Sequence, residues 1–453
     1  MKNKIMLLIT FLLIAFINNF CTNSDKSTDE SGSIIKANIK NIYTPISQTP
    51  ESSLIGTKGR EIWVRRNELI ILKPKGFKKE DVLNAINEEL NSKGIKVNNL
   101  TILKYCDECD DKVILLGGEG IENYVFTLSP GGGDSCPNPN QPCQPQGKDS
   151  LVLTANSDSI QIKTIPNPTP AEFPKNEKTL IVAILDTGIN PSDDCFRNNT
   201  NYFYTTSDGK VKGIDVVNNL PDFNDWSGSV PSSSGETDGQ FHGTKVTKII
   251  LSQIRDTENV KIIPIKVTNG CPGQLYDALC GLFTAQKYKA DIINISWGYL
   301  ANDDVYRLTK KIFNYLKSEK VTIVAAAGND DVNLDEIQNR RYPACFKDSL
   351  NNIYSVTSAK ILRPGLLIAA ENMSVSGQFI DVGVVCDTNN DFKIPDCENR
   401  VGFVRNYGTS YATAFFTGYL CKKGLVHSTK IDVLNQITNV RVENMPDKVI
   451  NPN

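Results

Sequence analysis

From about residue 176 onward, short apolar runs alternate with stretches in which apolar residues recur at helical spacing. The runs predict strands at residues 180–185, 261–267, 291–296 and 321–326, and the periodic stretches predict helices at 244–254, 274–289, 304–317 and 409–420. Strands that are apolar throughout are typical of parallel sheets, in which helices cover both faces. The sequence therefore predicts an α/β fold with a mainly parallel sheet, and a functional site is expected at the carboxyl ends of its strands.

A shorter region ahead of this pattern predicts a small, separate α+β domain. It combines a strand-like run at residues 68–72, a helical spacing of apolar residues within 79–90, and two further strand-like runs at 100–103 and 112–116. The expected organisation is a signal peptide at 1–20, a polar tether at 21–58, the α+β domain at 59–128, a linker and processing region at 129–175, the larger α/β domain at 176–445 and a C-terminal tail at 446–453. The linker is assigned because nine of the eighteen residues 130–147 are Pro or Gly.

The first twenty residues predict export. Two lysines precede an apolar run from Ile5 to Ile17, which is too short to span a bilayer and is typical of a signal peptide. Cys21 follows, where bacterial lipoproteins carry their lipid-attachment cysteine, although Phe20 is bulky where such signals have a small residue. Membrane anchoring through a lipidated Cys21 and simple cleavage nearby both remain open. Either way we expect an exported protein, secreted or a cell-envelope lipoprotein of a bacterium.

The cysteines agree with an oxidising location. Eleven of the twelve remain beyond Cys21, and several lie in close pairs: Cys106/Cys109, Cys136/Cys143, Cys271/Cys280 and Cys386/Cys397. In an exported protein, such pairs predict disulfides rather than metal ligands, although their connectivity cannot be deduced from the sequence. If the close pairs are the disulfides, the odd count leaves at least one unpaired thiol among Cys195, Cys345 and Cys421. Zinc at Cys106 and Cys109 is the alternative, but no second pair of ligands accompanies them at a suitable spacing, so we expect no metal site.

Charge and composition argue against one class of partner and exclude one class of protein. Lys and Arg number 49 against 51 Asp and Glu, a net charge of −2, so no basic excess is available for a phosphate backbone and no nucleic-acid partner is expected. The only long apolar run is N-terminal, which excludes a membrane protein with several spans. An apolar fraction of 40% allows a sizeable core.

Four polar motifs lie at the end of a predicted strand or the start of a predicted helix. In chain order they are Asp-Thr-Gly at 186–188, His-Gly-Thr at 242–244, Gly-Asn at 328–329 and Gly-Thr-Ser at 408–410. Each alone has an ordinary explanation as a turn residue or a helix cap. Together they supply a carboxylate, an imidazole, an amide and a hydroxyl, which are the groups that nucleophilic catalysis requires.

The four motifs, in this order, resemble those of the subtilisin-like serine proteases, the subtilases. Residues 294–298, Asn-Ile-Ser-Trp-Gly, also resemble the substrate-binding strand of that family. The resemblance covers about residues 176–445. It implies a subtilisin-like fold and an exported serine endopeptidase that acts on protein or peptide substrates through an acyl-enzyme.

The resemblance also assigns roles to individual residues. It implies a catalytic triad of Asp186, His242 and Ser410, an oxyanion donor in Asn329, and substrate binding by Ser296, Trp297 and Gly298. The hydroxyl would attack, the imidazole would carry the proton, and the carboxylate would hold the imidazole. No cofactor is required for this chemistry. Structural calcium is common in the family, but no acidic cluster in the sequence maps a calcium site.

The sequence departs from the family pattern at three positions: Lys245 replaces a second His, Tyr411 a Met, and Ala414 a Pro. None of these changes removes a catalytic group. The domain at 59–128 resembles, by position and size, the propeptide-like domain common in the family, which implies an inhibitor of its own catalytic domain; a spacer or adhesion module is the alternative. Two other functions stay open, an inactive relative that only binds peptides and a surface interaction protein.

Overall fold

The computed structural model describes a defined set of residues on which the following account rests. These are 42–43, 52–57, 60–65, 68–73, 78–92, 94, 96–107, 112–119, 161–163, 179–190, 193–197, 200–204, 213–218, 242–254, 259–268, 273–301, 303–346, 350–363, 366–370, 373–386, 408–437, 439–443 and 449–450. The expected signal peptide, Cys21 and most of the expected linker lie outside them. No helix in this described part has the length and apolar character needed to cross a bilayer.

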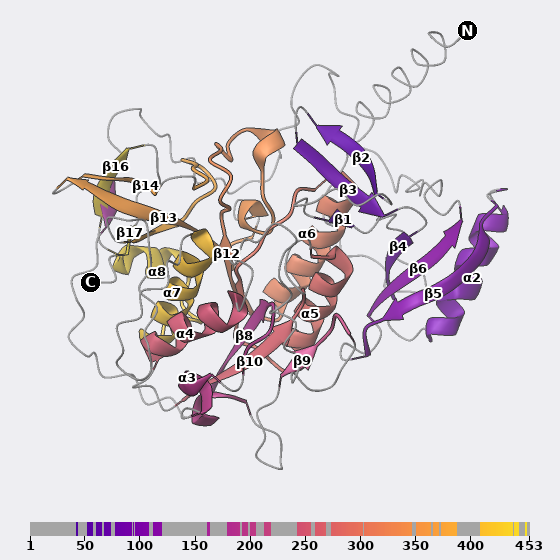
Figure 1. The fold of residues 1–453 in the computed structure, drawn as a ribbon, viewed down its shortest axis with the longest axis horizontal. Coiled ribbons are helices and arrows are strands. Elements are labelled where there is room, and N and C mark those ends of the chain that lie inside the picture. The colour runs from indigo at the N-terminus through magenta and orange to yellow at the C-terminus, as the bar shows by residue number, and fades with distance from the viewer. Residues whose placement is uncertain are drawn as a thin grey trace, which may run out of the picture.

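A parallel sheet forms the centre of the molecule, which confirms the predicted fold class (Figure 1). Its strands are β8 (Leu180–Asp186), β9 (Ile214–Asp215), β10 (Val260–Lys266), β11 (Ile292–Ile295), β12 (Thr322–Ala326), β13 (Ile353–Arg363) and β15 (Val382–Val385). Their spatial order is β9-β10-β8-β11-β12-β13, with β15 beside β13, and every one of these pairs is parallel.

Helices cover both faces of the sheet because successive residues of a strand point to opposite sides. On one face lie α4 (His242–Ile254) and α7 (Thr409–Lys422), which contact each other and pack on Val182 and Ile184 of β8. On the other face, α5 (Leu275–Lys287) and α6 (Asp303–Ser318) pack on Ala183 and Leu185 of the same strand. The predicted alternation of strand and helix is thus confirmed over this part of the chain.

The sequence did not predict β9, β13 and β15 of the parallel sheet, nor several short strands at the edges of the sheet. The structure adds β14 (Leu366–Ala369), β7 (Gln161–Lys163), β16 (Asn439–Glu443) and β17 (Val449–Ile450), together with the helices α3 (Asp194–Arg197) and α8 (Lys430–Gln436). β7 lies in the expected linker and pairs with β16, and β17 lies in the expected C-terminal tail and pairs with β15. Strands this short carry no periodicity, and their partners lie far away in the sequence.

The N-terminal region contains two antiparallel sheets. One has the order β4-β6-β5 and is formed by β4 (Glu68–Leu72), β6 (Val113–Glu119) and β5 (Asn98–Tyr105), with α2 (Lys79–Ser92) packed on it. These are the elements that the sequence predicts for the α+β domain. The other sheet combines β1 (Ile42–Tyr43), β2 (Ser52–Thr57) and β3 (Arg60–Arg65). β1 and β2 fall inside residues 21–58, the segment that the sequence predicts to be a polar tether.

Cysteine pairing differs from the prediction. Cys106 forms a disulfide with Cys280, 174 residues away in the sequence, so the predicted pairs Cys106/Cys109 and Cys271/Cys280 are wrong. The physical reason is that Cys106 follows β5 and faces α5 of the parallel-sheet domain, an approach that no local spacing reveals. The predicted Cys136/Cys143 pair lies outside the described residues.

Three other cysteines carry buried thiols: Cys345, Cys386 and Cys421. The thiol of Cys386 donates to the carbonyl oxygen of Ala359 at 3.0 Å, so its predicted pairing with Cys397 is also wrong. Cys195 is disulfide-bonded. Burial, with the Asp291 carboxylate nearby, raises the pKa of the Cys421 thiol to about 12. In the described part of the chain, no group of three His, Cys, Asp or Glu side chains is arranged to hold a metal ion.

Candidate active site

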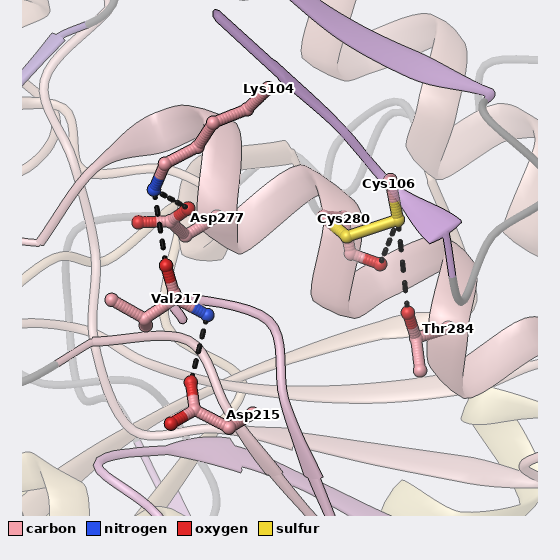
Figure 2. Close-up of a disulfide and its surroundings, with 7 residues drawn as sticks. All are labelled: Lys104, Cys106, Asp215, Val217, Asp277, Cys280 and Thr284. Atoms are coloured by element: carbon pink, nitrogen blue, oxygen red, sulfur yellow. Dashed lines mark hydrogen bonds and ion pairs between the residues drawn. A yellow bond between two sulfur atoms is a disulfide. The ribbon is translucent and has the colours of Figure 1, made fainter. Parts of the chain in front are cut away.

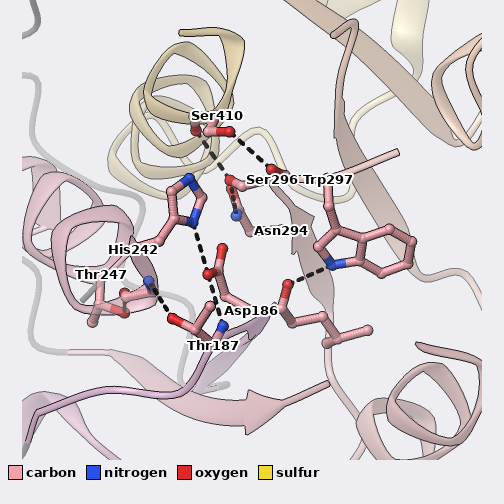
Figure 3. Close-up of polar contacts among 10 residues, drawn as sticks. Asp186, Thr187, His242, Thr247, Asn294, Ser296, Trp297 and Ser410 are labelled. Carbon is pink, nitrogen blue, oxygen red and sulfur yellow. Dashed lines mark hydrogen bonds and ion pairs between the residues drawn. The ribbon is translucent and has the colours of Figure 1, made fainter. Parts of the chain in front are cut away.

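A carboxylate and an imidazole meet where β8 ends and α4 begins. Asp186 is the last residue of β8 and its side chain is only 3% exposed; His242 opens α4, and its Nδ1 lies 2.8 Å from Asp186 Oδ1. Figure 3 shows the imidazole between this carboxylate and Ser410. Because Nδ1 faces a carboxylate, Nδ1 carries the proton, and Nε2 is the ring nitrogen left to accept one.

A hydrogen bond joins the start of α4 to the residue that follows β8. The N–H of Gly243 donates to the hydroxyl of Thr187 at 2.9 Å, and the N–H of Thr187 donates to Asp186 Oδ1 at 2.7 Å. A Cβ at Gly243 would collide with the carbonyl oxygen of Gly188, so only glycine allows the helix to start this near the strand. Asp186 Oδ2 is buried and has no hydrogen-bond partner among the described residues, which leaves much of the carboxylate charge to act on the imidazole.

Ser410 lies in the first turn of α7, on the same side of the sheet as His242. Its Oγ donates to the carbonyl oxygen of Ser296 at 2.8 Å, and Ser296 Oγ donates back to the carbonyl oxygen of Ser410 at 3.0 Å. Asn294 Nδ2 donates to Ser296 Oγ at 2.9 Å, and Thr417 Oγ1 donates to Asn294 Oδ1 at 2.9 Å. The helix start is therefore anchored to the end of β11.

An amide donor stands next to the hydroxyl. Asn329 follows β12 and is exposed, and its Oδ1 accepts hydrogen bonds from the N–H and the hydroxyl of Thr409, at 2.9 and 3.0 Å. Both bonds occupy the oxygen, so the amide is held with Nδ2 turned away from Thr409, and Nδ2 has no hydrogen bond among the described residues. Gly408 precedes the helix with φ 127° and leaves room for this amide, since a Cβ there would lie 2.8 Å from Nδ2.

The segment expected to bind substrate, residues 296–298, runs beside this site. The Trp297 indole Nε1 donates to the carbonyl oxygen of Leu185 at 2.8 Å, so the ring is tied to the end of β8. At Gly298 a Cβ would lie 3.3 Å from the carbonyl oxygen of Tyr342. The side chains of Ser296 and Trp297 thus hold the strand in place.

The structure brings all the predicted site residues to one edge of the sheet. It also adds positioning residues that we did not single out: Thr187, Thr409, Asn294 and Thr417. Thr187 and Thr409 stand inside the quoted motifs, and Asn294 is a polar residue within a buried apolar strand, a signal that could have been used. Tyr411, where the family has Met, packs its ring 5.6 Å from the His242 ring.

A hydroxyl, an imidazole and a buried carboxylate, with an amide donor beside them on an α/β sheet, define a serine hydrolase. The chain belongs to the subtilase family, peptidase family S8, whose family model matches residues 177–423. It is therefore a serine endopeptidase that acts on protein substrates, and the predicted family and enzyme class are confirmed. A comparison with curated proteins found no match.

Several solved structures are similar to this chain. The epidermin leader peptide processing serine protease EpiP from Staphylococcus aureus has 16% identity and a TM-score of 0.45, over 78% of this chain and 88% of that one. A cold-adapted subtilisin-like serine proteinase has 18% identity and a TM-score of 0.40, over 64% and 97%. The subtilase cytotoxin SubAB has 16% identity and a TM-score of 0.43, over 56% and 79%. The family assignment rests on the family model.

Asn329→Ala is expected to lower kcat by about 10²–10³-fold with little change in KM, a magnitude measured for the corresponding donor of subtilisin, a member of this family, and carried over from that enzyme. The reason is that the amide donates a hydrogen bond to the negative charge that develops in the transition state, and contributes little to binding of the substrate. Steady-state kinetics on a peptide substrate measure this effect. Asn339→Ala, in a surface turn where Nδ2 donates to the carbonyl oxygen of Asn333, is the control and should keep full activity. An equal loss in both variants would contradict the role of Asn329.

Proposed function

We propose that this protein is an exported serine endopeptidase that cleaves peptide bonds through a triad of Asp186, His242 and Ser410 and an oxyanion site at Asn329. The observation that carries the proposal is the 2.8 Å contact between His242 Nδ1 and Asp186 Oδ1, at the edge of the sheet where Ser410 opens a helix. Four separate segments of the chain converge there, each presenting the type of group that peptide hydrolysis requires.

In the proposed mechanism, the Ser410 hydroxyl turns to His242 Nε2 and attacks the scissile carbonyl while the imidazole takes its proton. Asp186 stabilises the imidazolium that forms. Asn329 Nδ2 and the N–H of Ser410 donate to the oxyanion, because the first N–H groups of a helix have no partner within the helix. The imidazole then gives its proton to the leaving amine, and water releases the acyl group from Ser410 in a second, equivalent step.

Labelling with a fluorophosphonate tests the proposal directly. This probe reacts with a serine that is activated by a base, and digestion of the labelled protein should place the adduct on Ser410. An inactive relative that only binds peptides, or a surface interaction protein, would not be labelled. Absence of labelling in correctly folded protein, or labelling that persists in Ser410→Ala, would reject the endopeptidase.

The pH profile of kcat/KM is expected to fall on the acid side, through the titration of His242 with uptake of one proton. A protonated imidazole cannot accept the proton of Ser410, so activity is present above this titration and lost below it. Only two histidines occur in the chain, and the other, His427, has its Nε2 3.1 Å from Asp291 Oδ1, at the start of β11 and away from the site. His427→Gln should therefore leave the profile unchanged. A flat profile of the parent protein between about pH 5 and 8 would contradict the assignment of the base.

Export and anchoring at Cys21 are part of the proposal, supported by the N-terminal sequence. If Cys21 is acylated, the protein should partition with the membrane fraction, and Cys21→Ser should move it to the soluble fraction. Residues beyond Cys21 would then connect the membrane to the enzyme. Soluble parent protein with an N-terminus downstream of Cys21 would favour simple cleavage instead.

We also propose that the chain is cut by its own active site between residues 129 and 176. The Pro- and Gly-rich composition of 130–147 favours the extended backbone that a protease accepts. The inhibitory role that the sequence predicts for the domain at 59–128 is not part of this proposal, because the contacts given for its described residues with the parallel-sheet domain are with α5, α6 and Val217.

A further inference from the structure

A covalent bond joins the N-terminal α+β unit to the parallel-sheet domain. The unit consists of β4, α2, β5 and β6, residues 68–119, and its Cys106 is disulfide-bonded to Cys280 in the middle of α5 (Figure 2). The chain between these residues contains the whole expected linker. Cutting that linker would therefore leave the two parts connected, provided that the bond survives.

Polar contacts flank the disulfide on both sides. Lys104 Nζ lies 3.4 Å from Oδ1 of the buried Asp277 on α5 and donates to the carbonyl oxygen of Val217 at 3.1 Å (Figure 2). Lys112 Nζ donates to Gln286 Oε1 at 3.3 Å and lies 5.4 Å from the centre of the Phe283 ring. Asp277 is 1% exposed, so this ion pair lies beneath the docked unit.

An apolar face of the unit also packs against α5 and α6. Its small sheet has two faces: Leu69 and Ile71 pack toward α2, whereas Ile70, Leu72, Val113 and Leu115 belong to the same hydrophobic cluster as α5 and α6. Departure of the unit would uncover this second face and the α5 surface together. An interface of this kind resembles a domain core cut in two, which is typical of permanent rather than transient association.

The disulfide itself is shielded. Cys106 is 0% exposed and Cys280 is 2% exposed, and the hydroxyl of Thr284 lies 4.0 Å from Cys106 Sγ. Thiol–disulfide exchange requires a thiolate to reach one of the sulfur atoms. The docked unit therefore shields the Cys106–Cys280 disulfide from exchange. The disulfide in turn keeps the unit at a high effective concentration next to α5.

With the unit docked, the site is partly exposed: Asn329 is exposed, the His242 side chain is 22% exposed and Ser410 is 8% exposed. None of the contacts of the unit named above involves a residue of the site, so retention of the unit is compatible with hydrolysis. We propose that the N-terminal unit is a permanent part of the working peptidase, retained through Cys106–Cys280 after any cut in the linker, and is not an inhibitor that dissociates.

The test uses the full chain with the recognition sequence of a site-specific protease inserted within residues 130–147. One preparation keeps Ser410 and one carries Ser410→Ala, so that the cut is made in both without reliance on the protein's own activity. After cutting, thiols are blocked and the protein is denatured and run with and without a dithiol. The dithiol delivers two electrons and two protons, which converts the disulfide to two thiols as the dithiol closes its own disulfide.

Without dithiol, both preparations should run as one species of full mass, and with dithiol they should separate into two chains. Two chains in the absence of dithiol would overturn the proposal. Peptide mapping of the unreduced protein should recover Cys106 joined to Cys280, and a different partner for Cys106 would equally overturn it. Cys386→Ser is the matched control, since it removes a buried thiol and should leave the cross-linked peptide intact.

Fluorophosphonate labelling of the cut, unreduced Ser410 preparation tests retention in the working form, and this arm rests on the proposed function. The label should migrate with the full-mass species and move to the smaller catalytic chain after reduction. Label found only on molecules that have lost the N-terminal unit would overturn the proposal. If no species is labelled, the endopeptidase fails, while the stained gel still reports whether the unit is retained.

Discussion

Ser410→Ala is expected to lower kcat by about 10⁶-fold, a magnitude measured for the nucleophile of subtilisin, a member of the same family, and carried over from that enzyme. In the proposed mechanism, the hydroxyl of Ser410 is the nucleophile. Without it no acyl-enzyme forms, and only the weak acceleration from substrate positioning and the oxyanion donors remains. Steady-state and single-turnover hydrolysis of a peptide substrate measure the loss.

The fold should survive this substitution, because the backbone carbonyl of Ser410 still accepts from Ser296. Ser318→Ala is the matched control; that hydroxyl bonds to the carbonyl oxygen of Tyr315 at the far end of α6, and its loss should leave kcat unchanged. If the chain processes itself, the Ser410→Ala protein should also accumulate uncut, whereas the parent should be cut between residues 129 and 176. Retention of more than about one per cent of the parental kcat in Ser410→Ala would contradict the role of the nucleophile.

Asp186→Asn is expected to lower kcat by about 10⁴-fold, the scale known for this substitution in another triad enzyme. The N–H of Thr187 and His242 Nδ1 both bond to the same oxygen, Asp186 Oδ1, at 2.7 and 2.8 Å. If the Asn oxygen takes that position, both bonds remain, but the negative charge that stabilises the imidazolium is lost. If the NH₂ takes it, the NH₂ faces Nδ1 and favours the tautomer of His242 in which Nε2 carries the proton and cannot act as the base.

The matched control is Asp291→Asn, because Asp291 is the carboxylate that pairs with the only other histidine of the chain. This control should keep kcat within about twofold, since Asp291 lies at the start of β11, away from the site. Thermal unfolding of both variants shows whether each still folds. If the two substitutions reduce kcat to the same extent, loss of structure rather than of the triad is the cause, and the assignment of Asp186 is wrong.

The elements around the site were largely predictable because each carries its own local signal. Leu180–Asp186 is a continuous apolar strand that ends in a polar residue, and residues 244–254 have apolar positions on one helical face. The structure starts that helix two residues earlier, at His242, since a helix end depends on its contacts, here the bond from Gly243 to Thr187. Strand β9, two residues long, and the edge strands β7, β16 and β17 are too short to carry a local signal and form only because a partner strand is already in place.

The pairing of the cysteines, in contrast, was not predictable from the sequence. Close spacing in sequence suggested Cys106/Cys109 and Cys271/Cys280, yet the disulfide joins Cys106 to Cys280. The choice of partner depends on which surfaces dock. The apolar face that carries Ile70 and Val113 meets α5, and the two sulfur atoms become neighbours through that contact. A pairing rule that uses only sequence distance contains no information on docking.

The sequence by itself determined which chemical groups are present and on which type of element each one lies, because apolar periodicity and the four motifs are local properties of the chain. Only the tertiary structure decided how these groups face one another. The orientation of the Asn329 amide follows from two bonds to Thr409, 80 residues away, and the anchoring of Ser410 follows from the end of β11. The attachment of the N-terminal unit to α5 was decided at the same level. Each depends on contacts between distant segments, which exist only after the sheet and its helices have packed.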